Sequence, residues 1–357
     1  MVFSYGARCF FLVHIFCSLT LYSEEGYASL EARIQNIFTD NKSAIVRVKA
    51  SKEKSVEGKK TRLLKMGSGF FVSKNGHILT TGLLPDAERI WIEFNKSYYL
   101  AEHLGSDSLC NLTLLKTIEK PRDFSFVSFE SLNPKVSRGS FLVGVTCALE
   151  FEIGPTFGIM QSYESSFGRN LFPTKMLRSS LPLGPGEVGG PVFDLHGNFI
   201  GITYAALPEI QSSFILNARA CSRIRDGLLL SGKVDYGWFG ITVSKKLNEQ
   251  NNSYMEIKSA SPDSKLKFGD KLIKIGNKQI SDRGDIVEST FFAKPGTFVK
   301  FLINRDGKEM TIQVKVSKRS ISSNIQNQDS NIQNISNDSN QSVEDNVVKE
   351  TNSSDSF

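Results

Sequence analysis

From about residue 44 onward, short apolar runs alternate with turn residues along most of the chain. Each run is rich in β-branched or aromatic residues and is about six to nine residues long, a length typical of strands. Several short strands at this spacing predict a β-sandwich or β-barrel. The runs are SAIVRVKA (43–50), GSGFFVS (67–73), HILTTG (77–82), RIWIEF (89–94), LTLLKT (112–117), GSFLVGV (139–145) and GNFIGITYA (197–205).

Helical periodicity is confined to two segments. Residues 29–40 place Leu30, Ile34, Ile37 and Phe38 on one face, and residues 216–232 read as a helix that ends at a glycine. The second helix is expected to close the first domain.

Two polar segments between apolar runs predict tight hairpin turns, at 74–76 and 195–198, because both contain Asn with Gly or Gly-Asn. The basic stretch 51–65 shows neither helical nor strand periodicity and is predicted to be a mobile loop between two strands.

A second, smaller β-rich unit follows the closing helix. Strands are predicted near 239–243, 254–258, 271–275, 297–303 and 309–316. After about residue 319 the chain is rich in Asn, Ser, Gln and Asp and cannot bury a core, so a disordered tail is predicted over 319–357.

The first 28 residues have the organisation of a secretory signal peptide. Arg8 precedes the apolar run 9–22, which is short for a membrane span, and small residues follow at Gly26 and Ala28. An exported, periplasmic or secreted protein is therefore expected, without a stable membrane span after cleavage. The alternative is an uncleaved N-terminal membrane anchor.

Length and charge narrow the classes of protein. A chain of 357 residues holds about two domains. The net charge is +6, but residues 320–357 carry −5, so the remainder carries +11. No nucleic-acid motif accompanies this dispersed charge, and no nucleic-acid partner is expected. Cys110, Cys147 and Cys221 lie outside the signal segment, at spacings that indicate neither a disulfide framework nor a metal site.

Three further segments resemble the three motifs that carry the catalytic triad of HtrA-type serine proteases. A trypsin-like site needs a histidine base, an aspartate that orients it and a serine nucleophile. The segment 67–84, GSGFFVSKNGHILTTGLL, is similar to the family's "ILTNxHVV" setting and places Leu83 at the histidine position. The segment 107–116, DSLCNLTLLK, is similar to "DxxxDLALLK" and places Asn111 at the aspartate position.

The third segment, 184–202, GPGEVGGPVFDLHGNFIGI, resembles "NPGNSGGPLxDxxGxVVGI" and places Val188 at the serine position. Gly186 and Val188 would supply the amides of a remnant oxyanion turn. Leucine, asparagine and valine at these positions lack the base, the charge and the nucleophile. His77 lies six residues before Leu83, in the preceding turn, and is not expected to replace the base. No catalytic residue, metal or cofactor is therefore expected.

The second unit resembles the PDZ domain of the same family. Residues 236–243, YGWFGITV, are similar to the loop that offers backbone amides to a peptide C-terminus, so Trp238, Phe239, Gly240 and Ile241 are the predicted peptide-binding residues. Residues 261–273 resemble "SPAxxAGLKxGDxI", shortened by about two residues.

The resemblance implies a mainly β protein, a trypsin-like double β-barrel followed by a PDZ domain and a disordered tail. The expected domains are 1–28 (signal peptide), 29–232 (protease fold), 233–318 (PDZ) and 319–357 (tail).

The expected function is an exported HtrA-like protein that is not an enzyme and that binds protein C-termini or unfolded polypeptide. It would act alone as a homotrimer or together with active relatives. The first alternative is an active serine endopeptidase of periplasmic protein quality control. The second alternative is an envelope scaffold.

Overall fold

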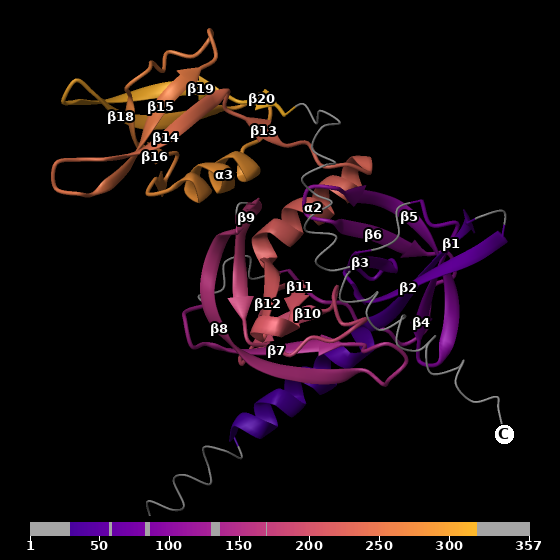
Figure 1. Ribbon diagram of the computed structural model, residues 1–357. Coiled ribbons are helices and arrows are strands. Elements are labelled where there is room, and N and C mark those ends of the chain that lie inside the picture. Colours follow the sequence, from indigo (N-terminus) through magenta and orange to yellow (C-terminus); the bar gives the residue numbers. More distant parts are fainter. Residues whose placement is uncertain (1–28, 57–58, 83–85, 130–135, 169, 320–357) are drawn as a thin grey trace, which may run out of the picture.

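The computed structural model describes residues 29–56, 59–82, 86–129, 136–168 and 170–319. Within these residues the fold is mainly β: two closed barrels are followed by a smaller sheet domain (Figure 1). The predicted signal peptide and nearly all of the predicted tail lie outside the described residues. No helix within the described ranges is long and apolar enough to cross a membrane.

The first barrel closes in the strand order β1-β2-β3-β6-β5-β4, with antiparallel pairs throughout. Its interior is filled by the alternate apolar residues of each strand; in β4, for example, Ile90, Ile92 and Phe94 are buried. Its strands are β1 (Ile45–Val56), β2 (Lys59–Phe71), β3 (His77–Thr81), β4 (Arg89–Phe94), β5 (Ser97–Asp107) and β6 (Leu112–Thr117).

The second barrel closes in the order β10-β11-β12-β9-β8-β7, again with antiparallel pairs. Two short 3₁₀ helices accompany the barrels, η1 (Lys42–Ala44) and η2 (Pro208–Ile210). The strands are β7 (Phe141–Thr146), β8 (Gly154–Phe167), β9 (Asn170–Ser179), β10 (Pro191–Asp194), β11 (Phe199–Leu207) and β12 (Ser212–Asn217).

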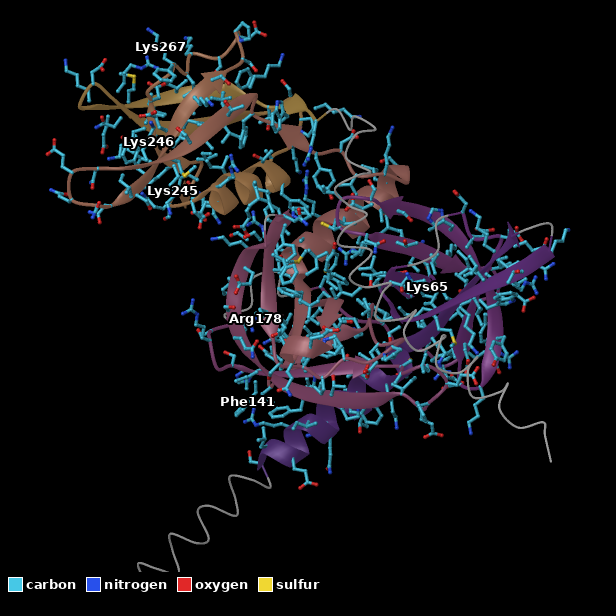
Figure 2. The ribbon with its side chains drawn as sticks, in the orientation of Figure 1. Lys65, Phe141, Arg178, Lys245, Lys246 and Lys267 are labelled. Carbon is cyan, nitrogen blue, oxygen red and sulfur yellow. The ribbon has the colours of Figure 1, made fainter. Side chains whose placement is uncertain are left out.

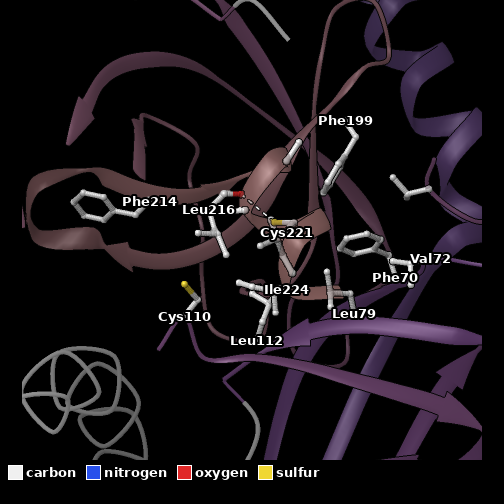
Figure 3. Packing of buried hydrophobic residues seen from close by; sticks show 14 of the residues in the cluster. Phe70, Val72, Leu79, Cys110, Leu112, Phe199, Phe214, Leu216, Cys221 and Ile224 are labelled. Carbon is white, nitrogen blue, oxygen red and sulfur yellow. Dashed lines mark hydrogen bonds between the residues drawn. The ribbon is translucent and has the colours of Figure 1, made fainter. Parts of the chain in front are cut away.

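A shared apolar core joins the two barrels to helix α2 (Ala218–Ser231). Phe70 and Leu79 from the first barrel, Phe199 from the second and Ile224 from the helix are all buried in one cluster (Figure 3). Asn217 caps the helix by accepting a hydrogen bond from the Ala220 amide. The helix contacts strands of both barrels, so it holds them in a fixed relation.

The leading helix and the closing helix are confirmed: residues 29–41 are helical, and α2 ends at Gly232, which adopts a left-handed conformation with φ of 69°. Both predicted hairpin turns are also present, with Gly76 and Gly197 at positive φ. The three described cysteines are free and buried.

The predicted mobile loop at 51–65 is wrong. β1 and β2 continue through most of this segment as a paired ribbon, in register from Ile45 opposite Phe70 to Val56 opposite Lys59. Lysine, arginine and leucine side chains at 60–64 are exposed in this ribbon, since it extends beyond the barrel interior. Because the side chains at 60–64 face solvent, this segment carries no alternating apolar pattern, and its strands could not be predicted from the sequence.

The third unit is a sheet in the order β14-β15-β16-β18-β19, with helix α3 packed on it. The short strand β17 pairs with β16, and β13 pairs with β20 as a separate two-stranded sheet. The elements are β13 (Gly237–Trp238), β14 (Ile241–Leu247), β15 (Ser253–Ala260), β16 (Lys271–Ile275), β17 (Lys278–Gln279), α3 (Arg283–Phe292), β18 (Phe298–Arg305), β19 (Lys308–Lys315) and β20 (Ser317–Lys318).

Helix α3 connects this unit to the second barrel, where it lies next to β9 (Figure 1). The Lys175 amine donates to Asp285 at 2.8 Å. A Cβ added to Gly284 would overlap the Ser165 side chain of β8, so only glycine allows this approach. The helix therefore sets the position of the sheet relative to the barrels.

An ion pair braces the small domain, and its removal gives a testable stability change. Both oxygens of Asp270, a residue 1% exposed, accept from the Arg305 guanidinium, at 2.6 and 2.7 Å. Burial alone would raise the pKa of Asp270, but the hydrogen bond from Arg305 outweighs it and holds the pKa below 3.8. The pKa of Asp270 is lower in the folded protein than in the unfolded chain. The ion pair therefore stabilises the fold at a pH above the pKa of the unfolded chain, and this stabilisation is lost as the pH falls through the pKa of the folded protein.

Asp270→Asn is expected to lower the melting temperature of the small domain by several degrees at pH 7 and by less at pH 3. Thermal unfolding followed by circular dichroism at both pH values measures this difference. An equal effect at both pH values would contradict the assignment. Asp263→Asn, which changes an exposed carboxylate in the same domain, serves as the matched control.

Candidate functional site

The three segments that resemble the triad-bearing motifs, 67–84, 107–116 and 184–202, meet at the carboxyl end of β3. The Ser68 amide donates to the Val188 carbonyl at 3.0 Å, and a Cβ on Gly189 would lie 3.1 Å from the Thr81 nitrogen. On the other side, the Gly82 amide donates to the Asn111 carbonyl at 3.3 Å. The turn at 184–190 and the loop at Asn111 therefore meet the same strand end. Leu83, the next residue, lies outside the described residues.

The turn that carries Val188 is held by several hydrogen bonds. The Thr203 hydroxyl accepts from the amides of Gly189 and Gly190, at 2.9 and 3.0 Å, and donates to the Glu187 carbonyl at 2.9 Å. The Glu187 carboxylate accepts from the Thr146 hydroxyl at 2.6 Å and from the Gly184 amide. These bonds fix the backbone of the turn on both sides of Val188.

The amides predicted for an oxyanion turn are those of Gly186 and Val188. Gly186 has a φ of 84°, and Gly189 has a φ of 99°, so both are in the region that favours glycine. Among the described residues, neither the Gly186 nor the Val188 amide donates a hydrogen bond to a protein acceptor. Two unsatisfied amides in a fixed turn could bind a carbonyl oxygen or oxyanion, and this role stays a prediction.

The side chains at the described triad positions lack acid–base groups. Val188 has no polar side-chain atom, and the Asn111 amide carries no charge. Asn111 has a φ of 50°, a conformation that asparagine tolerates better than most residues. The assignment of Leu83, Asn111 and Val188 to the triad positions stays a prediction.

Two of the three described histidines, His77 and His103, have side-chain partners away from this turn. Nδ1 of His77 lies 2.7 Å from the Ser73 hydroxyl, and the residue pairs with Lys116 at the amino end of β3, opposite to Gly82. Burial and the nearby Lys116 lower the pKa of His77. Nε2 of His103 lies 2.6 Å from Ser106, and His196 is exposed in the turn before β11.

Sequence reasoning missed one ionisable group at the carboxyl end of β3. The Lys65 amine on β2 lies 3.8 Å from where a Cβ on Gly82 would be (Figure 2). Burial lowers the pKa of Lys65 below its usual 10.5. The residue stands in a run of basic residues, and only the tertiary structure distinguishes it from its exposed neighbours.

A pocket of about 570 Å³ lies between the barrels and the small domain. Its charged lining residues are two arginines, Arg283 and Arg319, and it contains no aspartate or glutamate. The lining comes from the loop at Asn111, from the start of β9, from β14 and from α3. A pocket lined by two arginine side chains and by no carboxylate favours a negatively charged ligand.

Three of the four predicted peptide-binding residues line this pocket: Trp238, Phe239 and Ile241. Trp238 is 45% exposed, whereas the Phe239 ring is buried against Phe301, with ring centroids 5.1 Å apart. Gly240 has a φ of 65°, and a Cβ there would overlap the Ser261 hydroxyl. The fourth residue, Gly240, therefore shapes the loop without lining the pocket.

The loop before β14 has donors free for a ligand. In the part of the chain that the structure describes, the amides of Phe239 and Gly240 donate to no backbone or side-chain acceptor. β14 is an edge strand, since within the described sheet it pairs with β15 alone. A free strand edge beside free amides is the arrangement that binds an extended peptide by its C-terminus.

Comparison with known families identifies the two parts of the chain. Residues 67–202 match the trypsin-like peptidase domain, and residues 237–316 match the PDZ domain. The chain therefore consists of a trypsin-like peptidase domain followed by a PDZ domain. Relatives and solved structures named as DegP-like or HtrA-type proteases are similar to this chain.

Two curated relatives, from Bartonella henselae and Pseudomonas fulva, are each named "Probable periplasmic serine endoprotease DegP-like". Each is 26% identical, over 76% and 72% of this chain and 56% and 57% of the relative. The chain thus spans about half the length of the curated relatives it matches. A solved structure, "HtrA-type protease AlgW with decapeptide", is 17% identical with a TM-score of 0.64, and the match covers 81% of this chain and 99% of that one.

The prediction that the protein is not an enzyme is wrong on this comparison. The relatives are named serine endoproteases and the similar structures are named proteases, which points to an enzyme. The prediction rested on the residue identities at Leu83, Asn111 and Val188, with His77 set aside as a replacement base, and it did not consider the Lys65 amine.

Proposed function

We propose that this protein is an exported HtrA-type protein of envelope protein quality control that binds polypeptide C-termini in the groove between β14 and α3. The observation that carries the proposal is the free edge of β14 next to the unsatisfied amides of Phe239 and Gly240. The solved structure of the HtrA-type protease AlgW was determined with a decapeptide, which supports a peptide as the ligand class.

A peptide would add to β14 as a further antiparallel strand. Its terminal carboxylate would accept from the loop amides, and Arg319 would add positive charge, because its amide donates to the Tyr236 carbonyl at the start of the loop, at 2.9 Å. The apolar residues Ile241 and Ile286 line the pocket where the last side chain of the peptide would lie. Backbone pairing provides affinity, and the pocket provides selection.

The proposal is tested with a ten-residue fluorescent peptide that ends in a free apolar residue. The same peptide with an amidated C-terminus is the matched control, since it removes only the carboxylate. We expect the free acid to bind at least about tenfold more tightly, because a carboxylate adds charge-assisted hydrogen bonds. Equal affinities in fluorescence anisotropy would rule out recognition of the C-terminus.

Serine endopeptidase activity is the second candidate, favoured by the names of the relatives. Hydrolysis at the 184–190 turn would need a nucleophile other than the Val188 side chain. The amine of Lys65 is a candidate proton acceptor because burial lowers its pKa. Incubation with unfolded casein and a fluorophosphonate probe, followed by mass spectrometry, would identify the labelled residue, and Lys65→Met would test the base.

This test separates the two candidates. If a preparation that binds the free-acid peptide neither cleaves casein nor becomes labelled, the second candidate is excluded and the first remains. The signal-like N-terminus and the periplasmic relatives support a periplasmic location as part of the proposal. Assembly as a homotrimer or with active relatives is likewise proposed, and light scattering of the purified protein measures it.

A further inference from the structure

We propose that the groove selects C-terminal peptides with an acidic residue four positions before the last residue, and that Lys245 on β14 is the residue that reads it. This inference rests on the proposed peptide binding and adds the class of ligand to it. The ligand would be the C-terminus of an exported polypeptide that ends in an apolar residue and carries this acid upstream.

The register of β14 decides which lysine faces the groove. Lys245 lies directly opposite Met255 on β15, and Lys246 lies opposite Tyr254. Residues directly opposite each other in an antiparallel pair point to the same face of the sheet. Met255 is 2% exposed and packs in the same core as Ile286 of α3. Lys245 therefore projects on the helix side of the sheet, and Lys246 projects on the other side.

The same alternation places the side chains of a bound peptide. With its carboxylate at the amides of Phe239 and Gly240, the last residue of an antiparallel peptide lies opposite Ile241. The residue two positions earlier then lies opposite Val243, and the residue four positions earlier lies opposite Lys245. These three peptide side chains all point to the helix side, because the side-chain period of a strand is two. The fifth residue upstream lies opposite Lys246, on the far face.

The positive charge of Lys245 is not neutralised by an ion pair within the described residues. Lys245 and Lys246 are exposed on β14 (Figure 2), and within the described residues neither forms an ion pair. Two other lysines of the domain do form ion pairs: Lys278 contacts both Asp285 and Glu288, and Lys318 contacts Asp235. Residues 233–318 carry sixteen basic and ten acidic residues, and no acid lines the pocket. An incoming carboxylate at this position thus meets an unpaired ammonium, in a domain that carries more basic than acidic residues.

The size of the effect follows from the exposure of Lys245. An opposite-charge pair directly across two strands, in contact with water, is worth about two- to fivefold in affinity. Reversing the charge at Lys245 replaces this attraction by a repulsion of similar size. Because the pair is exposed, the preference should shrink as ionic strength rises.

The test uses the full chain and ten-residue free-acid peptides that end in phenylalanine, with serine at the variable positions. One peptide carries aspartate four positions before the last residue, a second carries it five positions before, and a third carries no acid. We expect the first peptide to bind about two- to fivefold more tightly than the third in anisotropy at low salt. Lys245→Glu should reverse this order and leave the affinity for the third peptide within about twofold.

Lys246→Glu is the matched control, since it introduces the same charge one residue along on the opposite face. Lys246→Glu should preserve the preference for the peptide that carries aspartate four positions before its last residue. Equal binding of the first and third peptides, or an equal loss in both lysine variants, would overturn the inference while leaving C-terminal binding intact. Failure of all three free-acid peptides to bind would instead overturn the proposed function, and the inference with it.

Discussion

Gly240→Val is expected to weaken C-terminal peptide binding at least about tenfold, while both domains remain folded. A side chain at this residue would overlap the Ser261 hydroxyl, and a φ of 65° is unfavourable for a β-branched residue. Relief of both strains requires the loop to move, which displaces the amides of Phe239 and Gly240 from the carboxylate. Anisotropy with a free-acid peptide measures the loss.

Gly269→Val is the control for this variant. Gly269 also has a positive φ, of 88°, and lies in the same domain, but a Cβ there would meet no atom within 4 Å. It should therefore lose some stability through backbone strain and bind the peptide as the unmodified chain does. Equal loss of binding in both variants would show that domain stability, and not the loop geometry, controls the affinity.

Phe70→Ala should destabilise the two barrels by about 3–5 kcal/mol, a typical cost for truncating a fully buried phenylalanine. Phe70 is 0% exposed in the core shared by both barrels, and its ring centroid lies 5.6 Å from that of Phe199. A domain with a total stability of about 5–15 kcal/mol loses a large part of it. Denaturant unfolding followed by circular dichroism measures the shift in midpoint.

Two matched variants locate the effect. Phe301→Ala creates a similar cavity in the separate core of the PDZ domain and should affect the transition of that domain. Leu230→Ala removes an apolar side chain that is 88% exposed and should change the midpoint little. A cost near zero for Phe70→Ala would mean that the shared core between the barrels does not determine their stability.

Much of the fold could be predicted from the sequence, where one face of an element is buried. Residues 271–275 were predicted as a strand and form β16, because Leu272 and Ile275 point into the PDZ core. The meeting of the three motif segments at the end of β3 was not predicted, and it depends on glycines that allow close approach. Gly189, for example, leaves no room for a side chain against Ser68.

Helix α3 was not predicted, and its first turn shows why. Gly284 lowers helix propensity there, although Asp282 and Asp285 form a capping box. The glycine is required by a partner far away in sequence, Ser165 of β8, which no local pattern reveals. The same limit applies to Lys65 and Arg319, because their positions at the two candidate sites depend on tertiary packing.

The free edge of β14 has a further consequence for the behaviour of the chain in solution. Unpaired edge strands are templates for association with other chains. Here the start of β9, including Asn170 and Phe172, lines the same pocket as β14, so the barrel domain restricts access to that edge. A single extended strand is narrower than a folded sheet, so we expect this restriction to act more strongly against a second sheet. We therefore expect the contact between α3 and the second barrel to reduce self-association through β14, and a PDZ domain separated from the barrels to associate more readily.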